Sequence, residues 1–354
     1  MTQLREREEF LGIVLGYHLG LNDAAGRPEP GDVGGLGGTM CLAFLAAQVA
    51  NATPAQAVTT AAAMELAKDV TQLQDDILDE DRLRREKPSA WTVFGIARTL
   101  LAADAAKAAA FDLLDDGSAH APAALRHLRQ ALDLCGVGQA QDIAAEHRPL
   151  LGPQAMWIAD FRRIATNKTC SLLACTYSLG AVFAGAQQSL IDGLIDVGRS
   201  LGMALQVLDD VLDLWGPLQD NQRRPYSDLR QGKKTFPLLT ALTADTQASS
   251  ELLQLLADTP LAENDLPRAA ELIYKAGGRA ASVTEVHRAY SAALTALEAL
   301  ALSSPASHDL VAVSSLIGLR GPNQTVSVSF PALSTHQPPA RIRLPNRWKS
   351  RDRP

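Results

Sequence analysis

Several sequence features are scarce or absent in this chain of 354 residues. No run of eighteen apolar residues occurs and the charged start, Met1–Glu9, has no apolar signal core, so neither a transmembrane helix nor a signal peptide is expected. A formal net charge of −6 gives no electrostatic reason to expect nucleic acid as a partner. The four cysteines lack metal-type spacing, and Cys170 and Cys175 are expected to be small core residues. We therefore expect a cytoplasmic protein.

The composition indicates a nearly all-helical chain. Alanine and leucine dominate, aromatic residues are only 5%, and no set of segments could build a sheet. Pro54 suits a helix start and Ser89 a helix N-cap. The expected helices cover residues 3–18, 39–79 with a break at 51–54, 89–114, 121–146, 153–186, 189–214, 233–244, 249–257, 267–276, 278–303 and 307–319. The predicted fold class is all-α, a bundle of long helices whose core can hold a site.

The composition changes after residue 320. Residues 1–320 are expected to form one domain, whereas 321–354 is rich in proline and arginine and is expected to be a disordered tail. The alternative is a docking arm for a membrane surface or a protein partner.

The sequence contains two aspartate clusters of the same design. Residues 75–79 read Asp-Asp-Ile-Leu-Asp and residues 209–213 read Asp-Asp-Val-Leu-Asp. In a helix, positions i, i+3 and i+4 lie on one side, so the three carboxylates of each cluster crowd together. Carboxylate oxygens are ligands that Mg2+ prefers. Two such clusters facing each other across a cavity would bind Mg2+ that bridges to a phosphate-bearing ligand.

Basic residues lie close to both clusters in the sequence. Arg84 and Arg85 follow the first cluster, Lys233 follows the second, and Lys168 interrupts an apolar helix between them. In a metal–diphosphate site, carboxylates hold the ions, the ions hold phosphate oxygens, and Lys and Arg neutralise the remaining charge. Departure of the diphosphate would leave a carbocation in an Ala- and Leu-lined cavity, with the positive ions stabilising the leaving group.

These motifs, at this spacing, resemble those of the trans-isoprenyl diphosphate synthase (polyprenyl synthetase) family, from about residue 17 to residue 320. The matching motifs are the first aspartate cluster with Arg84, Arg85 and Pro88, then Gly138-Gln139 with Asp142, Lys168-Thr169, Gln206 before the second cluster, and Gly232-Lys233 with Thr235 and Pro237. The resemblance implies an isoprenoid synthase-type helical bundle around a central cavity, and a homodimer.

The resemblance also implies roles for single residues. Three Mg2+ ions would bind Asp75, Asp79 and Asp209, with Asp76, Asp210 and Asp213 in direct or water-mediated support. The allylic diphosphate would be held by Arg84, Lys168 and Lys233, with Arg223 replacing a family lysine. Gln206 would lie by the reacting end of the substrate.

The chain departs from the family at the site for the second substrate. Members that extend prenyl chains hold isopentenyl diphosphate with a Gly-Lys-x-x-Arg-Pro motif, a histidine before the first aspartate cluster, and the second arginine after it. Here Leu36 and Thr39 align with the Lys and Arg of that motif, and Lys68 aligns with the histidine. Residues 28–67 contain no Lys or Arg, so only Arg85 clearly remains to bind that diphosphate. Burying a diphosphate beside one arginine has a large desolvation cost.

This departure predicts a class I terpene synthase-like lyase. Such an enzyme ionises an allylic prenyl diphosphate with Mg2+ and quenches the cation without isopentenyl diphosphate. Val70 and Thr71 are not large aromatic residues that would shorten the pocket, which favours a C15–C20 chain. The alternative is a trans-prenyltransferase of the farnesyl or geranylgeranyl diphosphate synthase type, which condenses an allylic diphosphate with isopentenyl diphosphate. A second alternative is a non-catalytic partner subunit of a prenyl synthase.

Overall fold

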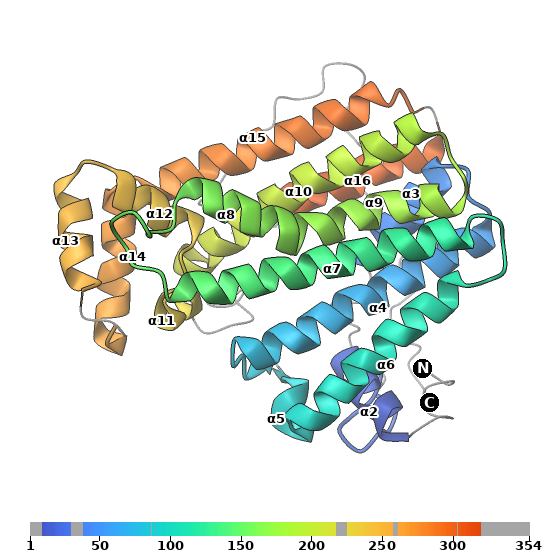
Figure 1. Ribbon diagram of the computed structural model, residues 1–354, viewed down its shortest axis with the longest axis horizontal. Helices are drawn as coiled ribbons and strands as arrows, with labels where there is room; N and C mark the ends of the chain where they lie inside the picture. Colours follow the sequence, from blue (N-terminus) through green and yellow to red (C-terminus); the bar gives the residue numbers. More distant parts are fainter. Residues whose placement is uncertain are drawn as a thin grey trace, which may run out of the picture.

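The fold is known from a computed structural model, which describes residues 9–29, 38–85, 87–216, 225–257, 261–302 and 304–319, the last with side chains to residue 314. The predictions for Leu36, Arg223 and the tail 321–354 lie outside the described residues. The described chain is 76% helical with few strands (Figure 1), which confirms the predicted fold class.

The amino-terminal half contains the helices that carry the first aspartate cluster. The elements are α2 (Glu9–His18), α3 (Gly38–Val49), α4 (Pro54–Leu78), β1 (Leu83–Arg84), β2 (Lys87–Pro88), α5 (Ala90–Phe94), α6 (Ile96–Leu114) and α7 (Ala121–Glu146). A capping box at Thr53, with Pro54 as the first helical residue, fixes the start of α4. The strands β1 and β2 form a short antiparallel hairpin directly after the cluster.

The carboxy-terminal half contains the second cluster at the end of a long helix. The elements are α8 (Ile158–Ala165), a π-helical turn η1 (Thr166–Cys170), α9 (Ser171–Phe183), α10 (Gln188–Trp215), α11 (Ser227–Gln231), α12 (Phe236–Thr243), α13 (Gln247–Leu255), η2 (Glu263–Asp265), α14 (Leu266–Lys275), α15 (Gly278–Ala299) and α16 (Pro305–Leu319). Within the described residues, none of these helices has both the length and the apolar character needed to cross a bilayer.

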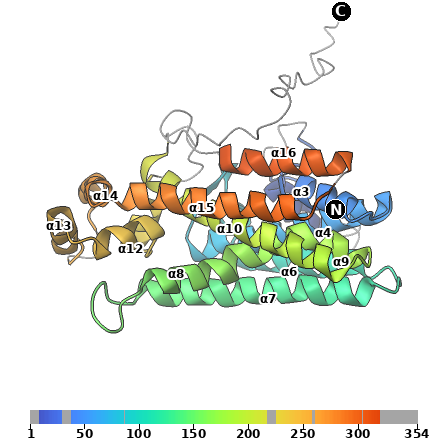
Figure 2. The same ribbon diagram turned by 90° about the horizontal axis from the view of Figure 1, so that it is seen from above.

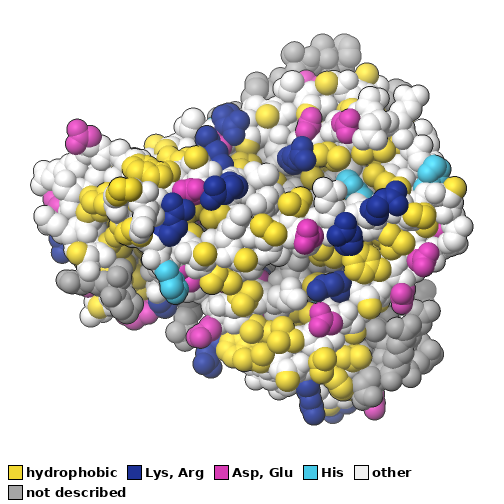
Figure 3. Space-filling view, in the orientation of Figure 1, with side chains coloured by type: hydrophobic (Ala, Val, Ile, Leu, Met, Phe, Trp, Pro, Cys, Tyr) yellow, Lys and Arg dark blue, Asp and Glu magenta, His cyan; other side chains and the backbone are white. Residues whose placement is uncertain are grey.

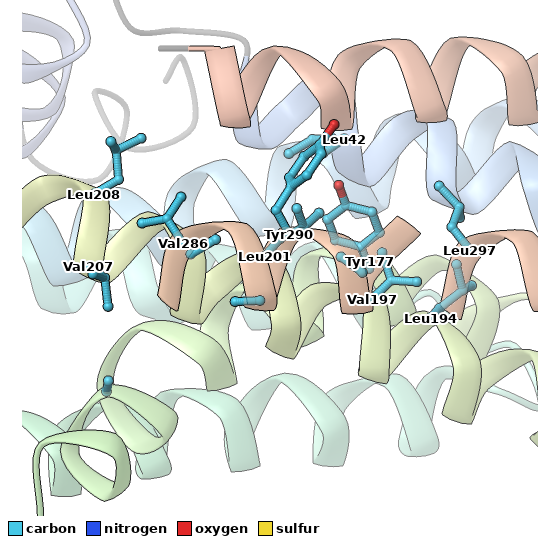
Figure 4. Packing of buried hydrophobic residues seen from close by; sticks show 14 of the residues in the cluster. Leu42, Tyr177, Leu194, Val197, Leu201, Val207, Leu208, Val286, Tyr290 and Leu297 are labelled. Carbon is cyan, nitrogen blue, oxygen red and sulfur yellow. The ribbon is translucent and has the colours of Figure 1, made fainter. Parts of the chain in front are cut away.

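The helices pack in layers around α9 and α10. Helix α10 lies against α9 and α15, α4 lies between α3 and α6, and α7 covers α9. Figure 2 shows α7 along one edge of the bundle and α16 along the opposite edge. Side chains from α9, α10 and α15 meet in the largest core cluster, where Tyr177, Leu201 and Tyr290 lie close together (Figure 4). Full burial of each large side chain stabilises the fold by about 1.5–3 kcal/mol.

Several helix boundaries differ from the sequence prediction. The helix expected over 89–114 is broken at Gly95, whose φ of 81° is available to glycine at little cost. The helix expected from residue 153 begins only at Ile158 and contains the π-helical turn, and the helix expected from residue 233 begins at Phe236. Cys170 and Cys175 are buried as predicted.

Candidate active site

The first aspartate cluster forms the last turn of α4 and its cap. Asp76 is buried and accepts a hydrogen bond from Arg84 Nε at 2.9 Å, with a second, shorter contact from the same guanidinium. In the described part of the chain its other oxygen, Oδ2, is buried without a hydrogen-bond partner. Asp79 accepts a hydrogen bond from Lys233 Nζ at 2.6 Å. Burial and the charge of Asp75 raise the pKa of Asp79, although Lys233 and Lys168 oppose them.

Lys168 reaches the same cluster from the π-helical turn. Its Nζ lies 2.9 Å from Asp142 Oδ2 and 3.4 Å from Asp75 Oδ1. Burial alone would lower the pKa of Lys168, but the charges of Asp75 and Asp142 outweigh it, so the pKa is raised and the ammonium is retained. The turn is possible because Gly138 on α7 has no side chain: a Cβ there would lie 2.3 Å from the backbone nitrogen of Lys168.

The three carboxylates of the second cluster, at the end of α10, have different surroundings. Asp209 is exposed. Asp210 is buried and accepts hydrogen bonds from the Phe236 N–H (2.9 Å), at the start of α12, and from Gln206 Nε2 (3.2 Å). Burial and the charge of Asp228 raise the pKa of Asp210 well above its usual range. Asp213 accepts hydrogen bonds from the N–H groups of Ser227 (2.9 Å) and Asp228 (3.2 Å), where α11 begins.

The segment 227–236 connects the two clusters. Lys233 Nζ lies 2.6 Å from Asp79 and 3.8 Å from Asp228, and Gln231 Nε2 donates to the Asp79 carbonyl at 2.7 Å. Gln206 also accepts a hydrogen bond of 2.5 Å from Thr169 Oγ1, beside Lys168. The structure thus brings the end of α4, the π-helical turn and the end of α10 to one site.

The chemistry of the donor set fits Mg2+. Within the described residues, no three His, Cys, Asp or Glu side chains converge closely enough to form a complete metal centre. Carboxylate oxygens of Asp75, Asp79 and Asp209 are nevertheless hard ligands of the kind that Mg2+ takes, with diphosphate oxygens completing the coordination. Two of these aspartates are held by Lys168 and Lys233, which would be free to bind diphosphate once the carboxylates bind cations.

A second group of charged side chains lies where α2, α4 and the hairpin meet. Lys68 Nζ is 2.5 Å from Glu65 and 3.2 Å from Asp69, and His18 Nε2 is 3.5 Å from Asp69. Arg85, in the left-handed backbone region with φ 53°, donates to the His18 carbonyl (3.2 Å) and to Gln72 Oε1 (3.1 Å). Sequence reasoning identified Lys68 and Arg85 here but missed His18 and Asp69. The only sequence signal was the position of His18 in the first segment that resembles the family.

A family model described as Polyprenyl synthetase matches residues 37–273. The chain belongs to the polyprenyl synthetase family. Its relatives include the (2E,6E)-farnesyl diphosphate synthase of Mycobacterium tuberculosis (strain ATCC 25618 / H37Rv), 34% identical over 294 residues, which are 81% of this chain and 80% of the relative. The geranylgeranyl diphosphate synthase of the same strain is 33% identical over 318 residues, covering 89% of this chain and 88% of the relative.

The solved structures agree with this family membership. The crystal structure of polyprenyl synthetase from Streptomyces coelicolor A3(2) is 35% identical, with a TM-score of 0.78, and covers 87% of this chain and 91% of that one. Polyprenyl synthetases such as this one have the all-α isoprenoid synthase fold. The similarity therefore confirms the helical bundle that the sequence resemblance implied.

The expected terpene synthase activity is wrong. The two Mycobacterium tuberculosis relatives are named farnesyl and geranylgeranyl diphosphate synthases, which favours the prenyltransferase alternative and not a lyase. The prediction rested on the lack of Lys and Arg in residues 28–67. The fold also brings residues from outside this range together, since Arg85 donates to the His18 carbonyl and both Lys68 and His18 contact Asp69.

Proposed function

We propose that this polyprenyl synthetase is a Mg2+-dependent trans-prenyltransferase, which condenses an allylic diphosphate with isopentenyl diphosphate to give a farnesyl- or geranylgeranyl-type product. The observation that carries the proposal is the meeting of both aspartate clusters through the segment 227–236, which binds Asp79 by Lys233 and Asp213 by the N–H groups of Ser227 and Asp228. Lys168 lies beside the first cluster. The names of relatives at 33–34% identity support the same reaction.

The first cationic set serves the allylic substrate. Asp75, Asp79 and Asp209 would hold a set of three Mg2+ ions, whose positive charge would neutralise the diphosphate and make it a better leaving group. Arg84, Lys168 and Lys233 bind the remaining phosphate oxygens. The allylic C–O bond breaks, and its electron pair leaves with the diphosphate.

The second cationic set serves isopentenyl diphosphate. Lys68 and Arg85 hold its diphosphate, with a ring N–H of His18 as a third donor. The double bond of isopentenyl diphosphate forms the new C–C bond to the allylic carbon, and the loss of one proton restores a double bond. Glu65 and Asp69 neutralise Lys68 before the substrate enters, which limits the cost of keeping its charge buried.

Product analysis tests the proposal directly. Purified protein with Mg2+, geranyl or farnesyl diphosphate and labelled isopentenyl diphosphate is expected to yield a prenyl diphosphate five carbons longer. EDTA should abolish the reaction and Mg2+ should restore it. Release of a hydrocarbon or alcohol from the allylic diphosphate alone, without label incorporation, would contradict the proposal.

A pair of variants tests the second diphosphate site. Arg85→Ala should raise the KM for isopentenyl diphosphate at least tenfold, since a charge-assisted hydrogen bond contributes about 1.5–3 kcal/mol, while the KM for the allylic substrate changes little. Lys87→Ala is the matched control, because Lys87 lies in the same hairpin but is exposed and paired with Glu29. An unchanged KM in Arg85→Ala would remove Arg85 from this site.

A further inference from the structure

A cavity of about 800 Å3 lies beside the catalytic end of the bundle, between the end of α7, α11, the start of α12, and α13. Its volume is within the usual range for small-molecule sites. Much of its wall is apolar and consists of leucine side chains: Leu150, Leu229, Leu238, Leu253, Leu256 and Leu261. Figure 3 shows hydrophobic side chains beside Lys and Arg on the side of the molecule that carries α13 and α14.

The cations of this cavity differ in how their charge is balanced. Arg148 pairs with Asp160 at 3.1 Å, and Arg230 pairs with Glu263 at 2.6 Å. Lys234 instead donates to the carbonyl oxygens of Glu146 (2.5 Å) and Gly232 (3.0 Å), and among the described residues no carboxylate lies within ion-pair distance of it. Burial lowers the pKa of Lys234 although the charge of Glu146, on the same wall, opposes it. An anion from solution would therefore stabilise this half-buried ammonium.

The cavity shares one wall with the active site. Gln231, Lys233 and Lys234 all line it, yet Gln231 and Lys233 also bind Asp79 on the other side. A ligand that displaces residues 231–234 would move Lys233 relative to Asp79. Occupancy of the cavity and turnover are thereby coupled through one short segment.

We propose that this cavity binds a prenyl phosphate without Mg2+, with the isoprenoid chain on the leucine wall and the phosphate on Lys234, and that its occupancy slows turnover through Lys233. The choice of an isoprenoid ligand rests on the proposed function, since a prenyltransferase produces molecules of this class. The other candidate for the same wall and charge is a fatty acid.

The test fills the active site first and then titrates the cavity. Wild-type protein is saturated with Mg2+ and farnesyl thiodiphosphate, whose sulfur bridge resists ionisation, and farnesyl monophosphate is added in a calorimeter. A further saturable binding event is expected. Lys234→Ala should weaken it roughly tenfold or more, the effect of losing a charge-assisted contact, and Leu253→Trp should abolish it by filling the cavity.

Matched controls are available on the same surfaces. Lys275→Ala removes an exposed lysine, and Gln254→Trp adds the same bulk one residue along α13 on its exposed side. Both should bind farnesyl monophosphate like the wild type. Farnesyl monophosphate should also lower kcat of the wild type but not of Lys234→Ala, whose turnover without it should be unchanged.

Several outcomes would overturn the inference. They are the absence of the further binding event, equal affinity in Lys234→Ala and the wild type, or palmitate binding as tightly as farnesyl monophosphate. Failure of farnesyl thiodiphosphate to bind with Mg2+ would instead count against the proposed function. In that case, titration of farnesyl monophosphate in EDTA, with the same four variants, would still show whether the cavity binds it.

Discussion

At the scale of single residues, the six aspartates of the two clusters have different surroundings. Asp76 holds Arg84, while Asp210 and Asp213 accept backbone N–H groups at the starts of α12 and α11. Asp75 and Asp79 are held by lysines, and Asp209 is exposed. Metal binding by Asp75, Asp79 and Asp209 remains a prediction, and the other three have contacts that explain a structural role.

Asp209 and Asp213 should therefore respond differently to replacement. Asp209→Ala should reduce Mg2+-dependent turnover at least 100-fold with an unchanged Tm, because it removes an exposed carboxylate that we propose as a metal ligand. Asp213→Ala removes a helix cap worth about 1 kcal/mol and should lower the Tm by about 2 °C. Thermal melts and Mg2+-titrated rates separate the two effects. A tenth of wild-type activity in Asp209→Ala would exclude it as an essential ligand.

Asp69 should make the stability of the fold depend on pH in the acid range. Burial by itself would raise the pKa of Asp69, but His18 and Lys68 outweigh it and lower the pKa. Asp69 therefore contributes stability above its unfolded pKa of about 3.9 that is lost as the pH falls through the lower folded pKa. Urea unfolding at pH 7, 5, 4 and 3 should show that Asp69→Asn is less stable at pH 7 and loses less stability below pH 4. Parallel profiles for variant and wild type would contradict this.

At the scale of secondary-structure elements, the π-helical turn and α7 depend on each other. Gly138→Ala should push the backbone of Lys168 away, lowering both the Tm and turnover, since its Cβ would lie 2.3 Å from Lys168 N. Gly136→Ala is the matched control on the same helix, because its Cβ would meet nothing within 4 Å. That control should be neutral or more stable by up to about 1 kcal/mol, the helix-propensity gain of alanine. Equal behaviour of the two variants would show that close packing at Gly138 is unimportant.

The same elements show how far the sequence alone could predict the structure. Helix α7 was predicted within its observed bounds, and α4 nearly so, because Pro54 and a long alanine-rich stretch are local signals. The break at Gly95 has a local cause, the positive φ of a glycine, which the predicted helix 89–114 did not take into account. The π-helical turn depends on its close packing against Gly138, and such tertiary packing overrides local propensity. In the site, the i, i+3 and i+4 spacing correctly predicted that the aspartates of each cluster lie at one helix end. Contacts such as Asp210 with Phe236 or His18 with Asp69 join distant segments, so no local pattern could predict them.

At the scale of the whole molecule, α5 and α6 expose apolar side chains. Val93 on α5 and Ile96, Leu100 and Leu101 on α6 are exposed, and Figure 3 shows hydrophobic side chains gathered over this region. Val137 and Ile143 on α7 are also exposed, and α7 lies at the edge of the bundle in Figure 2. Contiguous exposed apolar surface commonly marks a protein interface. We propose that the chain forms a homodimer, as the family resemblance implied, and that this apolar surface lies in its interface.

Replacing Leu101 with lysine should therefore dissociate the homodimer. Leu101 is 55% exposed, so Leu101→Lys introduces two charges near the centre of a symmetric interface without disturbing the fold of a monomer. Val58→Lys is the control, because Val58 is similarly exposed, at 59%, but lies on α4 and not on α5, α6 or α7. Light scattering after gel filtration should give a dimer for the wild type and Val58→Lys and a monomer for Leu101→Lys. A monomeric wild type at micromolar concentration would contradict the homodimer, and a dimeric Leu101→Lys would place its interface elsewhere on the molecule.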